Sequence, residues 1–107
     1  MDHIHIKDQI RQGDVLLDPI AEIPAEAKII AESDIVLAYG EATGHAHRLK
    51  GRAVLMEHEG RRYLLVDGEP TLLVHEEHGT TVVKPRVYEV IAQREADLSG
   101  QWRQVID

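Results

Sequence analysis

The chain has 107 residues, no cysteine and a formal net charge of −7 at pH 7, so it is long enough for one domain with a single modest core. Hydrophobic residues make up 43% of the chain and charged residues 29%, which is typical of a globular protein and too apolar for a disordered one. The acidic balance argues against a nucleic-acid partner, because affinity for a phosphate backbone comes mainly from Lys and Arg.

Three absences bear on where the protein acts. No apolar run reaches the length of a membrane span, and the first residues lack the basic-then-apolar pattern of a secretion signal. The lack of cysteine excludes disulfide bonds and fits a reducing compartment. We therefore expect a soluble cytoplasmic protein with no membrane partner.

The composition favours strands over helices. The chain has no Phe, and Val, Ile and Leu occur in equal numbers, so two-thirds of its large aliphatic side chains are β-branched. Turn signals such as Asp18-Pro19 and Glu59-Gly60 recur at strand-length intervals. We predict a single all-β domain over residues 1–107, folded as a compact antiparallel sandwich or small barrel with at most short helical segments. Residues 1–12 could form a flexible N-terminal arm.

Alternation of apolar and polar residues predicts a series of short strands. In chain order they are Asp14–Leu17, Lys28–Ala31 (a strand or a single helical turn), Ile35–Tyr39, a strand through His47, Ala53–His58, Arg61–Val66, Thr71–Val74, Thr80–Val83 and Val87–Gln93. The tail over Leu98–Ile106 has apolar residues at helical spacing, interrupted by Gly100. The sequence does not decide whether this tail is helical or irregular.

The clearest local feature is a hairpin of the two strands Ala53–His58 and Arg61–Val66. The two residues between them, Glu59-Gly60, fit a two-residue turn that requires a positive φ at Gly60. In that register Glu57 faces Arg62 and Met56 faces Tyr63, which are favourable cross-strand pairs.

Four of the seven histidines fall into two close pairs, in the segments GHAH (His45, His47) and HEEH (His75, His78). Imidazole is the commonest metal ligand among side chains. On an extended strand, His45 and His47 point to the same face. His75 and His78 can meet if HEEH is a β-turn, which the following Gly79 favours.

We predict that His45, His47, His75 and His78 converge on one divalent transition metal ion. Imidazole ligands suit zinc, nickel, copper or iron better than calcium or magnesium. Carboxylates nearby could act as a ligand or as partners that orient an imidazole. These are Glu41, Glu76 and Glu77. The alternative is that the histidines are exposed loop side chains with no ligand.

Three blocks of the chain resemble a family of small uncharacterised bacterial proteins. They are YGEATGHAH from Tyr39, HEEHGT from His75 and VYEVIAQRE from Val87. The resemblance extends from Gly13 to about Glu95. It implies no activity.

A looser likeness is to cupins, small β-barrels whose metal site uses a His-x-His pair, a following Glu and a later His. His45 and His47 match the pair, and His75 or His78 matches the last ligand. The segment Lys50–Arg52 stands where cupins have the glutamate.

Two functions of different classes are compatible with these features. The first is a metal-binding domain, in which the ion is either structural or catalytic. An enzyme would need an open coordination position on the ion, with Glu41 or Glu77 as general base. The alternative is a non-catalytic binding or assembly module whose histidine-containing loops contact a partner protein or a second copy of the chain. The sequence does not decide whether the protein is an enzyme.

Overall fold

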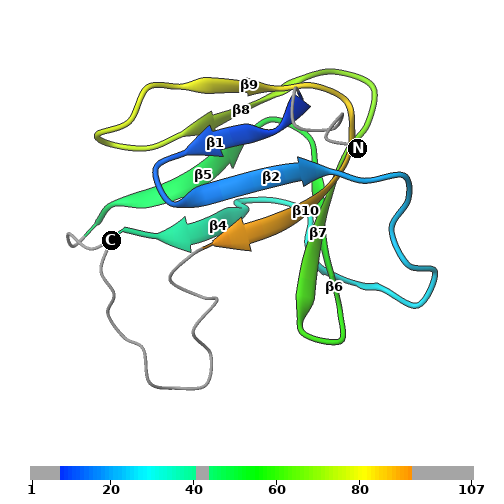
Figure 1. Cartoon of the computed structure of the whole chain (residues 1–107). Helices are drawn as coiled ribbons and strands as arrows, with labels where there is room; N and C mark the ends of the chain where they lie inside the picture. Colours follow the sequence, from blue (N-terminus) through cyan, green and yellow to red (C-terminus); the bar gives the residue numbers. More distant parts are fainter. Residues whose placement is uncertain (1–7, 41–43, 93–107) are drawn as a thin grey trace, which may run out of the picture.

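The computed structural model describes residues 8–40 and 44–92, which form two antiparallel β-sheets packed as a sandwich (Figure 1). The strands are β1 (Ile10–Gln12), β2 (Val15–Pro19), β3 (Lys28–Ala31), β4 (Val36–Tyr39), β5 (Ala46–Lys50), β6 (Val54–His58), β7 (Arg61–Val66), β8 (Thr71–Val74), β9 (Thr81–Val83) and β10 (Arg86–Ala92). The six-stranded sheet has the order β1-β2-β10-β7-β6-β3, and the four-stranded sheet has the order β4-β5-β8-β9.

Of the two predicted architectures, the sandwich is confirmed. The described residues contain no α-helix and no closed barrel. None of them forms a helix that is long and apolar enough to cross a membrane.

The two sheets enclose an aliphatic core because each strand places alternate residues inward. In β2, Val15 and Leu17 are fully buried, and β10 alternates in the same way around Tyr88 and Val90. The Tyr88 hydroxyl donates a hydrogen bond to the Lys84 carbonyl at 2.7 Å, so the buried ring keeps a partner for its polar atom.

Several predicted boundaries change in the structure. Residues 10–12, which the sequence placed in an N-terminal arm, form β1 and pair with β2. This strand holds one apolar residue, Ile10, so alternation over three residues gives almost no signal. The segment Lys28–Ala31 is a strand and not a helical turn. Gln93 and the tail 98–106 lie outside the described residues.

The predicted β6–β7 hairpin is confirmed, with Glu57 opposite Arg62 and Met56 opposite Tyr63. Glu59 and Gly60 have φ values of 51° and 81°. Positive φ at both central residues is the signature of a type I′ turn, whose twist matches that of the strands it joins.

Replacing Gly60 by Val should therefore destabilise the protein by about 1–2 kcal/mol, the cost of a left-handed backbone for an L-residue. An added Cβ at this position meets no atom within 4 Å, so the loss would come from the backbone alone. Urea unfolding measures it. Gly79→Ala is the control, because that position is also open but has no positive φ. Equal stability of Gly60→Val and the parent protein would contradict the assigned turn.

Candidate functional site

Four chain segments that carry polar residues of interest meet at one end of the sandwich. Strand β4 ends there at Tyr39, β5 begins at Ala46, and β8 ends at Val74. The turn between β1 and β2, at residues 13–14, lies at the same end, on the left in Figure 1. The two histidine pairs therefore lie at strand ends, where side chains can close the core without interrupting it.

The pairing of β5 with β8 brings the two histidine pairs together. Arg48 lies opposite Val74 in this pairing, so the next step of the register places His47 opposite His75. Residues opposite each other on antiparallel strands point to the same face. The ring centroids of His47 and His75 are 4.3 Å apart, which agrees with their opposite positions in the extended β5–β8 register.

Two more contacts follow the same extended register. The backbone amide of Ala46 donates to Glu76 Oε1 at 2.9 Å. One residue further along, His45 Nδ1 lies 3.7 Å from Glu77 Oε2. The loop after β8 is thus fixed to the start of β5 through side chains instead of a backbone ladder.

Bends at residues 76–78 turn His75 and His78 toward each other. Their ring centroids are 4.5 Å apart, so the predicted closeness of this pair is confirmed. The bends are stabilised locally by the Glu77 amide, which donates to His75 Nδ1 at 3.0 Å. The His78 ring also stacks against His47, with a centroid distance of 5.7 Å.

The four predicted histidines, here called the histidine cluster (His45, His47, His75 and His78), form two overlapping groups of donor atoms. One atom from each of His47, His75 and His78 lies within 4.8 Å of the other two. A second group with the same spacing consists of His45, His75 and Glu76. His75 therefore belongs to both groups. Glu41, a predicted carboxylate partner, lies outside the described residues.

A buried glutamine that the sequence analysis did not select controls the orientation of His47. Gln12 is 3% exposed, and its Nε2 donates to the carbonyls of Leu73 (2.8 Å) and Gly79 (2.9 Å). These two bonds fix which end of the carboxamide is nitrogen. Its oxygen, which can only accept, lies 2.8 Å from His47 Nδ1.

The Gln12 contact selects one tautomer of His47. Because the carboxamide oxygen accepts, Nδ1 of His47 must carry the proton, and in the neutral ring Nε2 then has a free lone pair. Burial, followed by the neighbouring His75, lowers the pKa of His47 to about 4, against an opposing effect of Asp14. The ring is therefore neutral at pH 7 and able to act as a ligand.

The pKa values of His75 and Glu76 are also shifted from their ordinary values. Burial, then the charge of His78, lowers the pKa of His75. The hydrogen bond from the Ala46 amide lowers the pKa of Glu76. At neutral pH, His47 and His75 are thus neutral imidazoles close to the carboxylate of Glu76.

The β1–β2 turn closes one side of the cluster. Gly13 has a φ of +59°, and a Cβ at this position would lie 2.6 Å from His78 Nε2, so the absence of a side chain lets the ring lie against the turn. The next residue, Asp14, places Oδ1 3.4 Å from His47 Nε2. Gly13-Asp14 is recognisable as a turn in the sequence, but nothing local shows that histidines pack on it.

Fold and site together define a small β-sandwich domain with a cluster of histidines at one end. The chain belongs to a family described as a domain of unknown function, DUF8820, whose model matches residues 11–93. The matched span includes Gln12, the β1–β2 turn and the whole histidine cluster. No curated protein and no solved structure matches the chain. The comparisons do not show the likeness to cupins, and the sheets do not close into a barrel.

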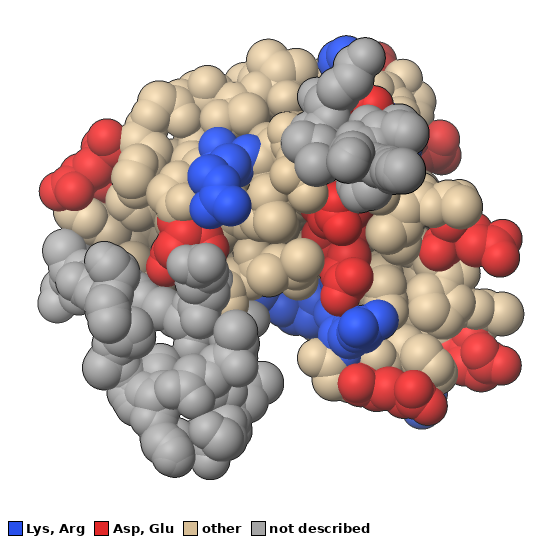
Figure 2. Space-filling model, viewed as in Figure 1, with Lys and Arg blue, Asp and Glu red and all other residues tan. Residues whose placement is uncertain are grey.

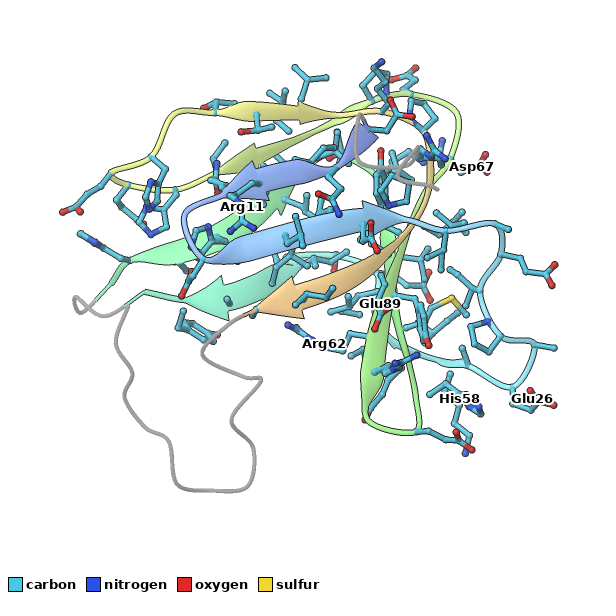
Figure 3. The ribbon with its side chains drawn as sticks, viewed as in Figure 1. Arg11, Glu26, His58, Arg62, Asp67 and Glu89 are labelled. Atoms are coloured by element: carbon cyan, nitrogen blue, oxygen red, sulfur yellow. The ribbon has the colours of Figure 1, made fainter. Side chains whose placement is uncertain are left out.

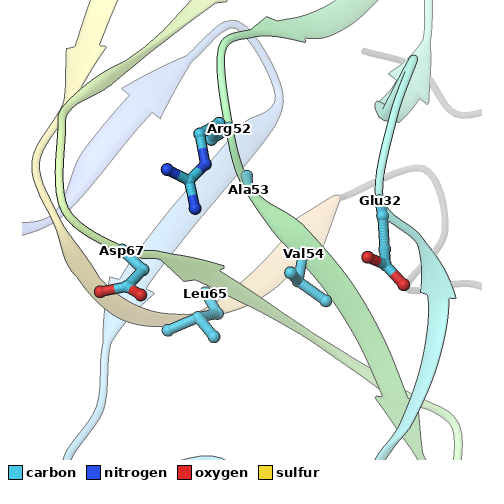
Figure 4. A pocket seen from close by; sticks show the side chains of 6 residues that line it. All are labelled: Glu32, Arg52, Ala53, Val54, Leu65 and Asp67. Carbon is cyan, nitrogen blue, oxygen red and sulfur yellow. The ribbon is translucent and has the colours of Figure 1, made fainter.

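A separate hollow of about 200 Å³ lies between the start of β6 and the end of β7 (Figure 4). It is lined by Glu32, Arg52, Ala53, Val54, Leu65 and Asp67. Its charged side chains come from exposed residues, and it includes no histidine. The histidine cluster is therefore the better candidate for chemistry.

Other surface features add little to the site. His58 lies at the tip of the β6–β7 hairpin, at the opposite end of the molecule from the cluster (Figure 3). On the face shown in Figure 2, basic side chains lie at separate positions among acidic ones and form no continuous patch. His58 serves below as a matched control.

Replacing Gln12 by Met should destabilise the protein by about 1–3 kcal/mol, because it keeps the shape but removes the hydrogen bonds to the Leu73 and Gly79 carbonyls and to His47 Nδ1. Urea unfolding would measure the change. The control is Gln9→Met, which removes a partly buried bond to Asp18 and should cost under about 1 kcal/mol. Similar losses for both variants would contradict a special role for Gln12.

The lowered pKa of His47 predicts a pH-dependent stability. Between pH 6.5, the ordinary value, and about 4, the unfolded chain binds a proton that the folded protein excludes. Stability should be full above pH 6.5 and fall by up to about 3 kcal/mol as the pH drops to 4, with His75 adding to the same trend.

The measurement is urea unfolding of EDTA-treated protein from pH 7.5 to 4.5. His47→Gln should reduce the slope, whereas His58→Gln should keep it. An unchanged slope in His47→Gln would show that another group is responsible.

Proposed function

We propose that this domain binds one divalent transition metal ion through His47, His75 and His78. The observation that carries the proposal is that donor atoms of these three rings lie within 4.8 Å of one another. Support comes from Gln12, since a metal-binding histidine commonly donates its other ring N–H to a protein acceptor. Here the carboxamide oxygen of Gln12 occupies that place beside His47 Nδ1.

The donor set limits the kind of ion. Three imidazoles suit zinc, nickel, copper or iron(II), and they disfavour calcium and magnesium, which prefer oxygen ligands. An ion with three protein ligands keeps a further position for water or a substrate, as in catalytic zinc sites. The number of protein ligands therefore decides between a catalytic and a structural role.

Binding would require a small change at His75. Its Nδ1 accepts a hydrogen bond from the Glu77 amide, so in the neutral ring the proton is on Nε2. Coordination through Nε2 would move that proton to Nδ1 and break the bond to Glu77. The bond is exposed and worth on the order of 1 kcal/mol, which a metal–ligand bond readily offsets.

The predicted four-histidine site and the triad of His47, His75 and His78 differ in whether His45 binds the ion. The predicted four-histidine arrangement includes His45, whereas the compact triad does not. His45 approaches the others only through His75, with ring centroids 5.6 Å apart. We therefore place it beside the ion and not in direct contact with it.

Protein prepared without a histidine tag should contain, or take up after EDTA treatment, about one equivalent of zinc. His78→Ala should weaken zinc binding by at least about tenfold; because His78 is exposed, its loss should leave the fold intact. His58→Ala is the control, and His45→Ala should bind zinc nearly as well as the parent protein. Elemental analysis and calorimetric titration measure these effects.

The opposite result would favour the second candidate function, a non-catalytic assembly module. Leu72 and Val82 lie opposite each other on β8 and β9 and are 41% and 56% exposed, which is the observation that supports it. Absence of stoichiometric metal, together with a defined oligomer in light scattering, would replace the metal-binding proposal with this one.

A further inference from the structure

The lone pair of His47 Nε2 faces an anionic oxygen. The Gln12 contact places one ring proton on Nδ1, so Nε2 is the position at which His47 can take up a second proton or a metal ion. Asp14 Oδ1 lies only 3.4 Å from Nε2. A carboxylate oxygen beside this nitrogen stabilises whichever cation binds there, a proton or a metal ion, so the two atoms can serve as ligands of one ion.

The spacing of the two atoms also matches coordination of a common ion. Zinc binds imidazole nitrogen at about 2.0–2.1 Å and carboxylate oxygen at about 2.0–2.2 Å, so neighbouring ligands of a tetrahedral ion are roughly 3.4 Å apart. The separation of His47 Nε2 and Asp14 Oδ1 is 3.4 Å, which matches this value.

The position of Asp14 in the fold brings it to the open side of the triad. It belongs to the β1–β2 turn, whose Gly13 lies directly against the His78 ring. Asp14 lies 3.4 Å from His47 but outside the donor group of the three rings, so ligation of a shared ion would require its side chain, which is 18% exposed, to turn toward His75 and His78. Gln12, two residues before Asp14, is buried and bonds to the Leu73 carbonyl. This contact keeps the β1–β2 turn in place.

We propose that Asp14 is the fourth ligand of the ion, which gives a closed three-histidine, one-carboxylate site. This inference rests on the proposed metal binding by His47, His75 and His78. It assigns the ion a structural role, because four protein ligands leave a tetrahedral ion no position for a substrate. The ion would join the β1–β2 turn of one sheet to the ends of β5 and β8 in the other.

Cobalt(II) tests the assignment, because it takes the place of zinc and its visible absorption reports coordination number and ligand type. EDTA-treated, tag-free protein is titrated with cobalt chloride. The parent protein should give the intense bands of a four-coordinate ion. Asp14→Ala should bind cobalt at least about tenfold more weakly, with weaker bands because water replaces the carboxylate.

Two further variants make the result specific. Asp14→Asn preserves the shape of the side chain, so it serves in place of Asp14→Ala if that variant does not fold, and it should also shift the spectrum. Asp67→Ala is the matched control, since Asp67 is an exposed residue of the hollow in Figure 4, away from the cluster. Its cobalt affinity and spectrum should equal those of the parent protein.

The outcomes separate the two proposals. If the parent protein binds none of cobalt, zinc, nickel, copper and iron(II), the proposed function itself is wrong. If it binds cobalt and both Asp14 variants keep its affinity and spectrum, metal binding stands and Asp14 is not a ligand. A spectrum that changes with Glu76→Gln and not with Asp14→Asn would assign the fourth position to the His45 side of the cluster and overturn the inference.

Discussion

The carboxamide of Gln12 is the contact on which the end of the sandwich depends. It joins β1 to His47 at the start of β5, to the Leu73 carbonyl in β8 and to the Gly79 carbonyl in the loop that follows β8. Every polar atom of this buried group has a partner, so it stabilises one arrangement of three segments, whereas an unsatisfied amide there would cost free energy. The same contact fixes the tautomer of His47. Core stability and the chemistry of the cluster thus rest on one side chain.

The cluster lies at a strand end because the sandwich has to be closed there. His47 continues the inward-facing row of Leu49 on β5, and His75 continues that of Leu73 on β8. Beyond the last aliphatic pair, imidazoles take over the packing role, since they fill space while presenting nitrogen atoms to the exterior. A site built on this extension inherits the rigidity of the paired strands beneath it.

The features predicted well from sequence are those set by neighbouring residues. Glu59-Gly60 determined the β6–β7 hairpin and its register. The sequence also allowed His75 and His78 to meet if the chain turns in the HEEH segment, and their rings do lie close together across bends at residues 76–78. The contacts of Gln12 and Asp14 with His47 could not be predicted, because they span 35 and 33 positions of the chain and depend on the pairing of β5 with β8. A buried glutamine also runs against the usual exposure of its residue type. For β1, three residues with one apolar side chain are too few for a periodic signal.

The separation of these residues along the chain has a consequence for folding. The β6–β7 hairpin needs only adjacent residues and can form within microseconds. The bond from Gln12 to the Leu73 carbonyl instead closes a loop of 61 positions, and its second bond requires residue 79. Contacts between residues so far apart in the sequence are among the last to form. A chain still being synthesised holds His45 and His47 long before the rest of the cluster exists, so a complete donor set is a property of the finished fold alone.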